Sequence, residues 1–92
     1  MNDDLIAVAA AQVEPRFARP EENRVMLRRY CELAARRQVR LLVFPELCVT
    51  GYNFPSRKSL ETLAEPVPDG PTTLLWLELA QVCDMSIVGG LA

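Results

Sequence analysis

Histidine is absent from the 92-residue sequence, and lysine occurs once, at Lys58. The missing histidine excludes every Ser-His or Cys-His catalytic arrangement and removes the most common metal ligand. Any chemistry that these residues carry must therefore rely on a carboxylate, a lysine or a thiol. No metal site is expected.

The three cysteines are an odd number, and no two of them form a C-x-x-C pair; they are Cys31, Cys48 and Cys83. A disulfide framework or a structural zinc site is therefore not expected, and a reducing cytoplasm fits this pattern. Residues 1–4 are acidic where a signal peptide would be basic. The apolar run over residues 5–13 is too short to span a bilayer. The sequence predicts a soluble, cytoplasmic protein.

Strong charge of either sign is also lacking, since the formal net charge is −2. This balance gives no reason to expect nucleic acid or a membrane surface as a partner. Half of the residues are hydrophobic (50%) and 24% are charged, which is typical of a globular chain. At this length, one small domain is the most that the chain can form.

The hydrophobic pattern predicts an α/β fold with the order strand, helix, strand, long loop, helix, strand. Residues 5–13, 41–44 and 86–90 are short apolar runs without alternation, typical of buried parallel strands. Residues 20–37 are a predicted helix, in which Pro20 suits the first helical position. A second predicted helix begins near Pro71 or Thr72 and ends at Cys83. The loop between them contains a possible short helix over residues 59–64.

The first predicted helix has two faces. Its apolar face, which we expect to pack on the sheet, comprises Met26, Leu27, Tyr30, Cys31, Leu33 and Ala34. Its opposite face, which we expect to be solvated, comprises Arg24, Arg28, Arg29, Glu32 and Arg36. Cys83 is similarly expected to pack on a helix face.

Two long helices can cover only one face of the predicted sheet, whereas strands this apolar need cover on both faces. We therefore expect residues 1–92 to be the amino-terminal part of a larger, apparently truncated domain. The alternative is a self-contained small domain that dimerises through its bare sheet face.

Glu46 is the single charged residue in the apolar run over residues 41–49. Pro45 lacks a ladder donor and favours an extended Phe44, so the strand should end there. Ligands bind at the carboxyl ends of strands in open α/β sheets, and a carboxylate is costly to bury unless it is paired or protonated. Glu46 is therefore a candidate general base, kept away from water. Alternatively, it simply begins a solvated loop.

The order of several short motifs resembles the nitrilase, or carbon–nitrogen hydrolase, superfamily over essentially the whole chain. The motifs are Ala10-Ala11-Gln12, Asn23, Ala34-Ala35, Leu42-Val43-Phe44-Pro45-Glu46, Thr50-Gly51-Tyr52, Gly70-Pro71-Thr72, Ala80 and Ile87-Val88-Gly89-Gly90. The Phe-Pro-Glu segment is the most specific of them. The resemblance implies a four-layer α-β-β-α sandwich about three times this length, of which the visible part is β-α-β-loop-α-β.

The resemblance also implies hydrolysis of a non-peptide carbon–nitrogen bond by a glutamate, a lysine and a cysteine, without a cofactor. Glu46 matches the glutamate, the general base. Lys58 comes too early to match the lysine, and Cys48, expected to be a buried or pocket-wall thiol, comes too early to match the nucleophile. The chain alone should therefore be inactive. The expected substrate is a small amide, nitrile or carbamoyl compound, and the full-length protein should form a homo-oligomer.

Tyr52 and Phe54 follow the glutamate in the long loop. One interpretation places them at the mouth of a substrate pocket. The other treats them as aromatic plugs that hold the loop against the sheet, and the sequence does not separate the two.

A Rossmann-type nucleotide-binding half-domain would need a glycine-rich first turn, but residues 12–19 contain no glycine. A non-catalytic remnant that acts as an interaction fragment is the alternative that the missing lysine and cysteine leave open.

Overall fold

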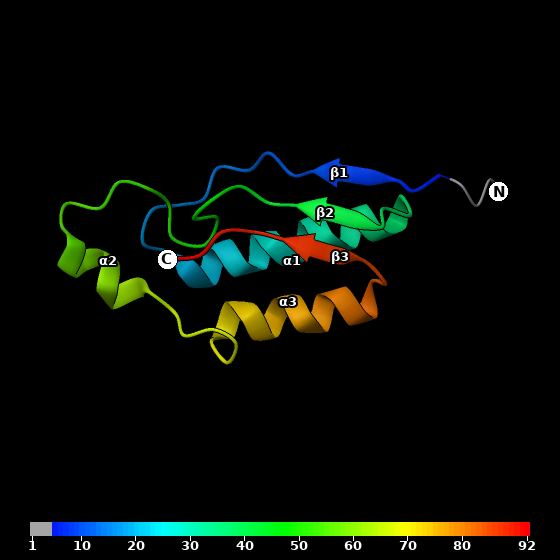
Figure 1. Ribbon diagram of the computed structural model, residues 1–92. Helices are drawn as coiled ribbons and strands as arrows, with labels where there is room; N and C mark the ends of the chain where they lie inside the picture. Colours follow the sequence, from blue (N-terminus) through cyan, green and yellow to red (C-terminus); the bar gives the residue numbers. More distant parts are fainter. Residues whose placement is uncertain (1–4) are drawn as a thin grey trace.

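The computed structural model describes residues 5–92 and contains three strands and three helices (Figure 1). In chain order they are β1 (Val8–Ala10), α1 (Pro20–Arg36), β2 (Leu41–Val43), α2 (Arg57–Leu63), α3 (Pro71–Val82) and β3 (Ser86–Val88). The predicted α/β order is confirmed. The short helix begins earlier than predicted, because the Ser56 hydroxyl caps it by accepting a hydrogen bond from the Ser59 N–H at 3.2 Å.

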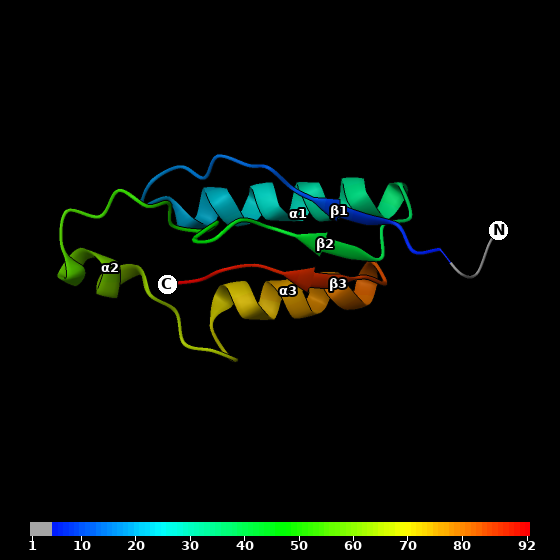
Figure 2. The ribbon, with the colours of Figure 1, turned by 45° about the horizontal axis from the view of Figure 1, so that its top comes forward.

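The three strands form a parallel sheet in the order β1-β2-β3. Ala9 pairs with Leu42, and Leu42 pairs with Ile87, so these three side chains point to the same face. Both crossovers run in the same direction across the sheet, and right-handed crossovers then place α1 and α3 on one face. Figure 2 shows the two helices behind the strands, with α1 next to β1 and β2 and α3 next to β3.

Each strand is only three residues long, so the predicted strand over residues 5–13 is wrong in its extent. β1 can pair only where β2 is present, and β2 is limited by Pro45. The pairing extends one step beyond the strands at each end: the Arg40 N–H donates to the Ala7 carbonyl at 2.8 Å, and the Ala11 N–H donates to the Val43 carbonyl at 2.8 Å. The chain beyond that point forms the loops at the carboxyl edge of the sheet.

The helix α1 packs on the sheet through a stripe that is narrower than predicted and displaced to one side. Its buried residues are Asn23, Leu27, Cys31 and Ala34. Tyr30 and Leu33 are exposed, so their placement in the core is wrong. The buried residues are spaced at i, i+4, i+8 and i+11, and this spacing leaves Tyr30 and Leu33 at the side of the buried stripe. Cys31 and Cys83 both pack against the core, as predicted.

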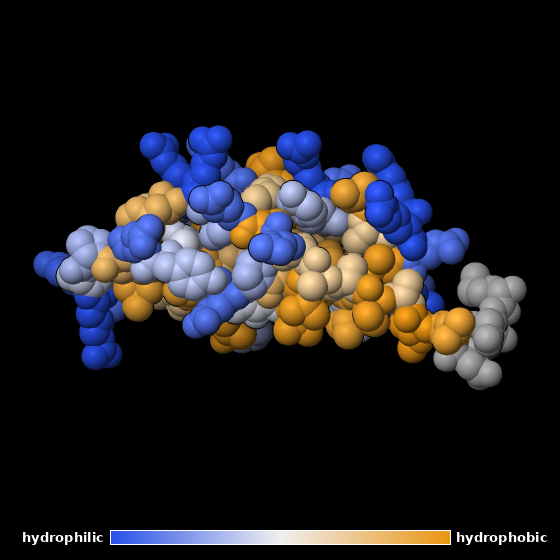
Figure 3. Space-filling model, turned by 90° about the horizontal axis from the view of Figure 1, so that it is seen from above, coloured by the Kyte–Doolittle hydropathy of each residue, from blue (hydrophilic) through white to orange (hydrophobic). Residues whose placement is uncertain are grey.

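The other face of the sheet is open in the described residues. Val8, Val43 and Val88 are exposed there, which confirms that the two helices cover one face only. Seen from above, hydrophobic side chains gather along one long edge of the molecule, while hydrophilic side chains stand along the opposite edge (Figure 3). Between residues 5 and 92, no helix is both long enough and apolar enough to span a membrane.

Candidate functional site

Glu46 lies at the carboxyl edge of the sheet, three residues after the end of β2, as the sequence predicts. It opens a compact turn over residues 46–50. Leu47 has a φ of 50°, and its carbonyl accepts hydrogen bonds from the N–H groups of Thr50 at 3.3 Å and Gly51 at 2.9 Å. Gly51 has a φ of 82°, a conformation that glycine adopts without steric cost. The backbone of this turn is therefore closely defined.

The Glu46 side chain is exposed, so the expectation that it is kept away from water is wrong for the described residues. The chain leaves the sheet at Pro45, and Glu46 is the first residue of the turn that follows. Among residues 5–92, no hydrogen bond or ion pair engages that carboxylate. The alternative, that Glu46 begins a solvated loop, therefore fits its surroundings within the described residues.

Tyr52 and Phe54 have different surroundings. The Tyr52 ring is exposed, and its hydroxyl donates to the backbone carbonyl of Glu46 at 2.6 Å. Phe54 is half-buried and packs edge-on against Phe17, with ring centroids 5.2 Å apart. Both aromatic residues therefore hold loops together at the carboxyl edge, and Tyr52 contacts the backbone of Glu46 directly.

Cys48 lies inside the turn and is fully buried, as predicted. Its thiol donates a weak hydrogen bond to the Gly90 carbonyl, with sulfur and oxygen 3.8 Å apart. Burial raises the pKa of this thiol to about 11, and the nearby Glu65 carboxylate adds to the shift. Because only the thiolate is a strong nucleophile, Cys48 is unsuited to attack a substrate. Lys58 lies exposed on α2.

Thiol burial predicts a pH dependence of stability. Burial raises the pKa of Cys31 from its usual 9.0 to about 12, and that of Cys48 to about 11. The unfolded thiols lose their protons from about pH 9, while the folded thiols keep theirs, so the free energy of unfolding should fall as pH rises from 9 towards 11. Urea unfolding between pH 8 and 10.5 measures this decrease. The decrease in unfolding free energy with pH should be smaller in a Cys31→Ala/Cys48→Ala variant. An unchanged decrease in that variant would show that other groups cause it.

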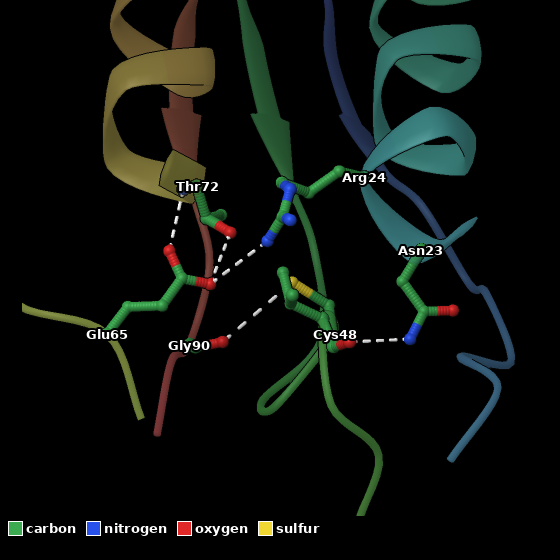
Figure 4. Close-up of polar contacts among 7 residues, drawn as sticks. Asn23, Arg24, Cys48, Glu65, Thr72 and Gly90 are labelled. Carbon is green, nitrogen blue, oxygen red and sulfur yellow. Dashed lines mark hydrogen bonds and ion pairs between the residues drawn. The ribbon is translucent and has the colours of Figure 1, made fainter. Parts of the chain in front are cut away.

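A buried polar cluster lies beside the Glu46 turn (Figure 4). The Glu65 carboxylate accepts hydrogen bonds from the Thr72 N–H and from the Thr72 hydroxyl, each at 2.7 Å. It also pairs with Arg24 of α1 at 3.4 Å, and the two side chains are 21 % (Arg24) and 10 % (Glu65) exposed. The prediction that Arg24 belongs to a solvated face is therefore wrong. This cluster joins α1, the long loop and the first turn of α3.

Sequence reasoning missed Glu65 and recorded Asn23 only as part of a resemblance. Glu65 carries no local signal, because its partner Arg24 is 41 residues away. Asn23 carries a weak local signal, because asparagine is unfavourable inside a helix unless its side chain bonds to nearby backbone. In the described part of the chain, no three His, Cys, Asp or Glu side chains are grouped to hold a metal ion.

Comparison with known proteins identifies the class. The family model described as carbon-nitrogen hydrolase matches residues 7–92, so the chain belongs to this family, whose domain is an α-β-β-α sandwich. It is similar to a nitrilase from Pyrococcus abyssi (strain GE5 / Orsay), with 32% identity over 88 residues, which are 96% of this chain and 34% of the relative. It is also similar to a protein N-terminal amidase from Schizosaccharomyces pombe (strain 972 / ATCC 24843), with 41% identity over 58 residues, 61% of this chain and 20% of the relative. The chain thus spans about a third or less of the length of these two relatives.

Proposed function

We propose that these residues supply the general base of an enzyme that hydrolyses a non-peptide carbon–nitrogen bond. The base is Glu46, and the substrate is a small amide, nitrile or N-carbamoyl compound. A lysine and a nucleophilic cysteine would come from polypeptide beyond residues 1–92. Membership of the carbon-nitrogen hydrolase family supports the reaction class.

One observation carries the role of Glu46: an unpaired carboxylate follows β2, the central parallel strand, at the edge where such sheets bind ligands. The turn that holds it is compact, so its backbone is fixed while its side chain stays accessible. A general base has to reach the proton that it abstracts, and this placement permits it.

The proposed reaction of an amide proceeds in two stages. Glu46 accepts the proton of the cysteine thiol, and the thiolate sulfur bonds to the carbonyl carbon. The lysine stabilises the oxyanion, the carbon–nitrogen bond breaks, and the protonated Glu46 gives its proton to the departing nitrogen. Water, deprotonated by Glu46, then attacks the thioester, the carbon–sulfur bond breaks, and Glu46 returns the proton to the leaving thiolate. One amide and one water thus yield one carboxylic acid and one ammonia.

The second candidate is a non-catalytic interaction fragment. The open sheet face favours it, since Val8, Val43 and Val88 would need a covering partner.

The proposal is tested by measuring the ammonia that the full-length polypeptide encoded by the gene releases from candidate substrates. The protein is purified, its mass is measured, and it is assayed with simple amides, nitriles, N-carbamoyl compounds and a peptide with an amino-terminal amide side chain. The proposal expects a mass above that of residues 1–92 and release from at least one substrate class. A folded polypeptide that turns over none of these substrates contradicts the proposal. If that inactive polypeptide is 92 residues long, the result supports the interaction fragment.

A further inference from the structure

Asn23 is a buried amide with an almost complete set of partners. It is the fourth residue of α1, and only 1% of its surface is exposed. Its Oδ1 accepts a hydrogen bond from the Arg16 N–H at 2.8 Å, and its Nδ2 donates to the Arg16 carbonyl at 2.8 Å and to the Val49 carbonyl. Both amide protons are therefore used, which a residue placed only to fill space would not require.

These hydrogen bonds join α1 to two loops at the carboxyl edge of the sheet. Arg16 belongs to the loop between β1 and α1, and Val49 belongs to the turn that begins at Glu46. The two loops also bond to each other, since the Ala18 N–H donates to the Thr50 carbonyl at 3.0 Å. In Figure 4 the Asn23 amide points from the first turn of α1 towards this turn.

The turn is also held by the segment that follows β3. The Cys48 thiol bonds to the Gly90 carbonyl. Gly90 also packs so closely that a Cβ atom built on it would lie 2.9 Å from the Cα of Glu46. The backbone of Glu46 is thus confined between Gly90 and a turn that Asn23 anchors to α1.

We propose that Asn23 is a positioning residue for Glu46: by bonding to the Val49 carbonyl, it sets where the Glu46 carboxylate stands relative to the reacting thiol. This inference rests on the proposed function. Catalytic groups must be held closely to their productive geometry, and a displacement of about 1 Å can cost roughly 100-fold in rate. A purely structural Asn23 would lower stability and leave the rate per folded molecule unchanged.

Replacing Asn23 separates these two roles. In the full-length polypeptide, Asn23→Ala should lower kcat by roughly 10- to 100-fold, with KM within about twofold, because the acid–base group is displaced while the substrate contacts remain. The matched control is Val39→Ala, which truncates a buried core residue near the amino edge of the sheet. That variant should lose thermal stability and keep its kcat. Equal kcat in Asn23→Ala and Val39→Ala would overturn the proposal.

Thiol alkylation provides a readout that does not depend on activity. Cys48 lies in the anchored turn, whereas Cys31 lies on α1 against the sheet, and both are 0% exposed. With iodoacetamide and peptide mapping, Asn23→Ala should raise the alkylation rate of Cys48 roughly tenfold while that of Cys31 stays constant. Equal acceleration of both thiols, or of neither, would mean that Asn23 does not anchor the turn.

The milder Asn23→Ser variant serves if Asn23→Ala does not fold. It is expected to show the same selective exposure of Cys48 with a smaller loss of kcat. Failure of the proposed function looks different: the unmodified polypeptide would show no turnover, or Glu46→Gln would remain active, whereas the alkylation pattern would still report whether Asn23 holds the turn.

Discussion

Glu46→Gln in the full-length polypeptide should lower kcat/KM by roughly 10²- to 10⁴-fold, the usual contribution of a general base. Glutamine has nearly the same shape as glutamate but cannot take a proton from a thiol. The native fold should not change, because no hydrogen bond or ion pair among residues 5–92 depends on that carboxylate. The expected change in unfolding free energy is within about 0.5 kcal/mol, as for most surface substitutions.

The matched control is Glu61→Gln, which removes the same charge from an exposed glutamate on α2. Glu61 is paired with Arg57 in the i,i+4 arrangement, and its loss should leave turnover unchanged. Pre-steady-state acylation and thermal unfolding are measured for both variants. Normal acylation in Glu46→Gln would remove Glu46 from the mechanism. A loss of activity accompanied by a large loss of stability would show that Glu46 has a structural role instead.

Strong local signals made most of the fold predictable. Pro20 and Pro71 begin α1 and α3 where predicted, and Pro45 ends β2 next to Glu46. The lengths of the strands were less predictable. An apolar run indicates which residues can form a strand, but it does not show how far the neighbouring strand extends to pair with them. The buried stripe of α1 differs from the predicted one because it includes Asn23, whose side chain bonds to the loops at the carboxyl edge of the sheet.

The candidate site was predictable in position and not in environment. Glu46 was found from a local pattern, whereas its supports are contacts between distant residues. Asn23 reaches Val49 across 26 positions, and Arg24 reaches Glu65 across 41. No periodicity or motif encodes such pairs. A charged residue on a helix is usually solvated, and only the arrival of the Glu65 loop makes Arg24 an exception.

Glu65→Ala should destabilise the protein by about 3–5 kcal/mol, the range found when one member of a buried ion pair is removed. Two effects combine at this site. The Thr72 N–H and hydroxyl lose their acceptor, and because Thr72 is 0% exposed, water cannot replace it. Arg24 also keeps a largely buried charge without its partner. A loss of this size is a large part of the stability of a typical domain.

The arginine–glutamate pair that joins α1 to α3 provides the comparison for Glu65→Ala. Arg28 and Glu78 lie 3.2 Å apart, but their side chains are 46% and 58% exposed. Glu78→Ala should therefore cost less than about 1 kcal/mol, and that small cost should disappear in 1 M salt, which screens exposed charges more than buried ones. Urea unfolding followed by circular dichroism measures both variants. Similar losses in the two would mean that the Glu65 carboxylate contributes no more than a surface charge; a much larger, salt-resistant loss in Glu65→Ala would identify it as the link between α1, the long loop and α3.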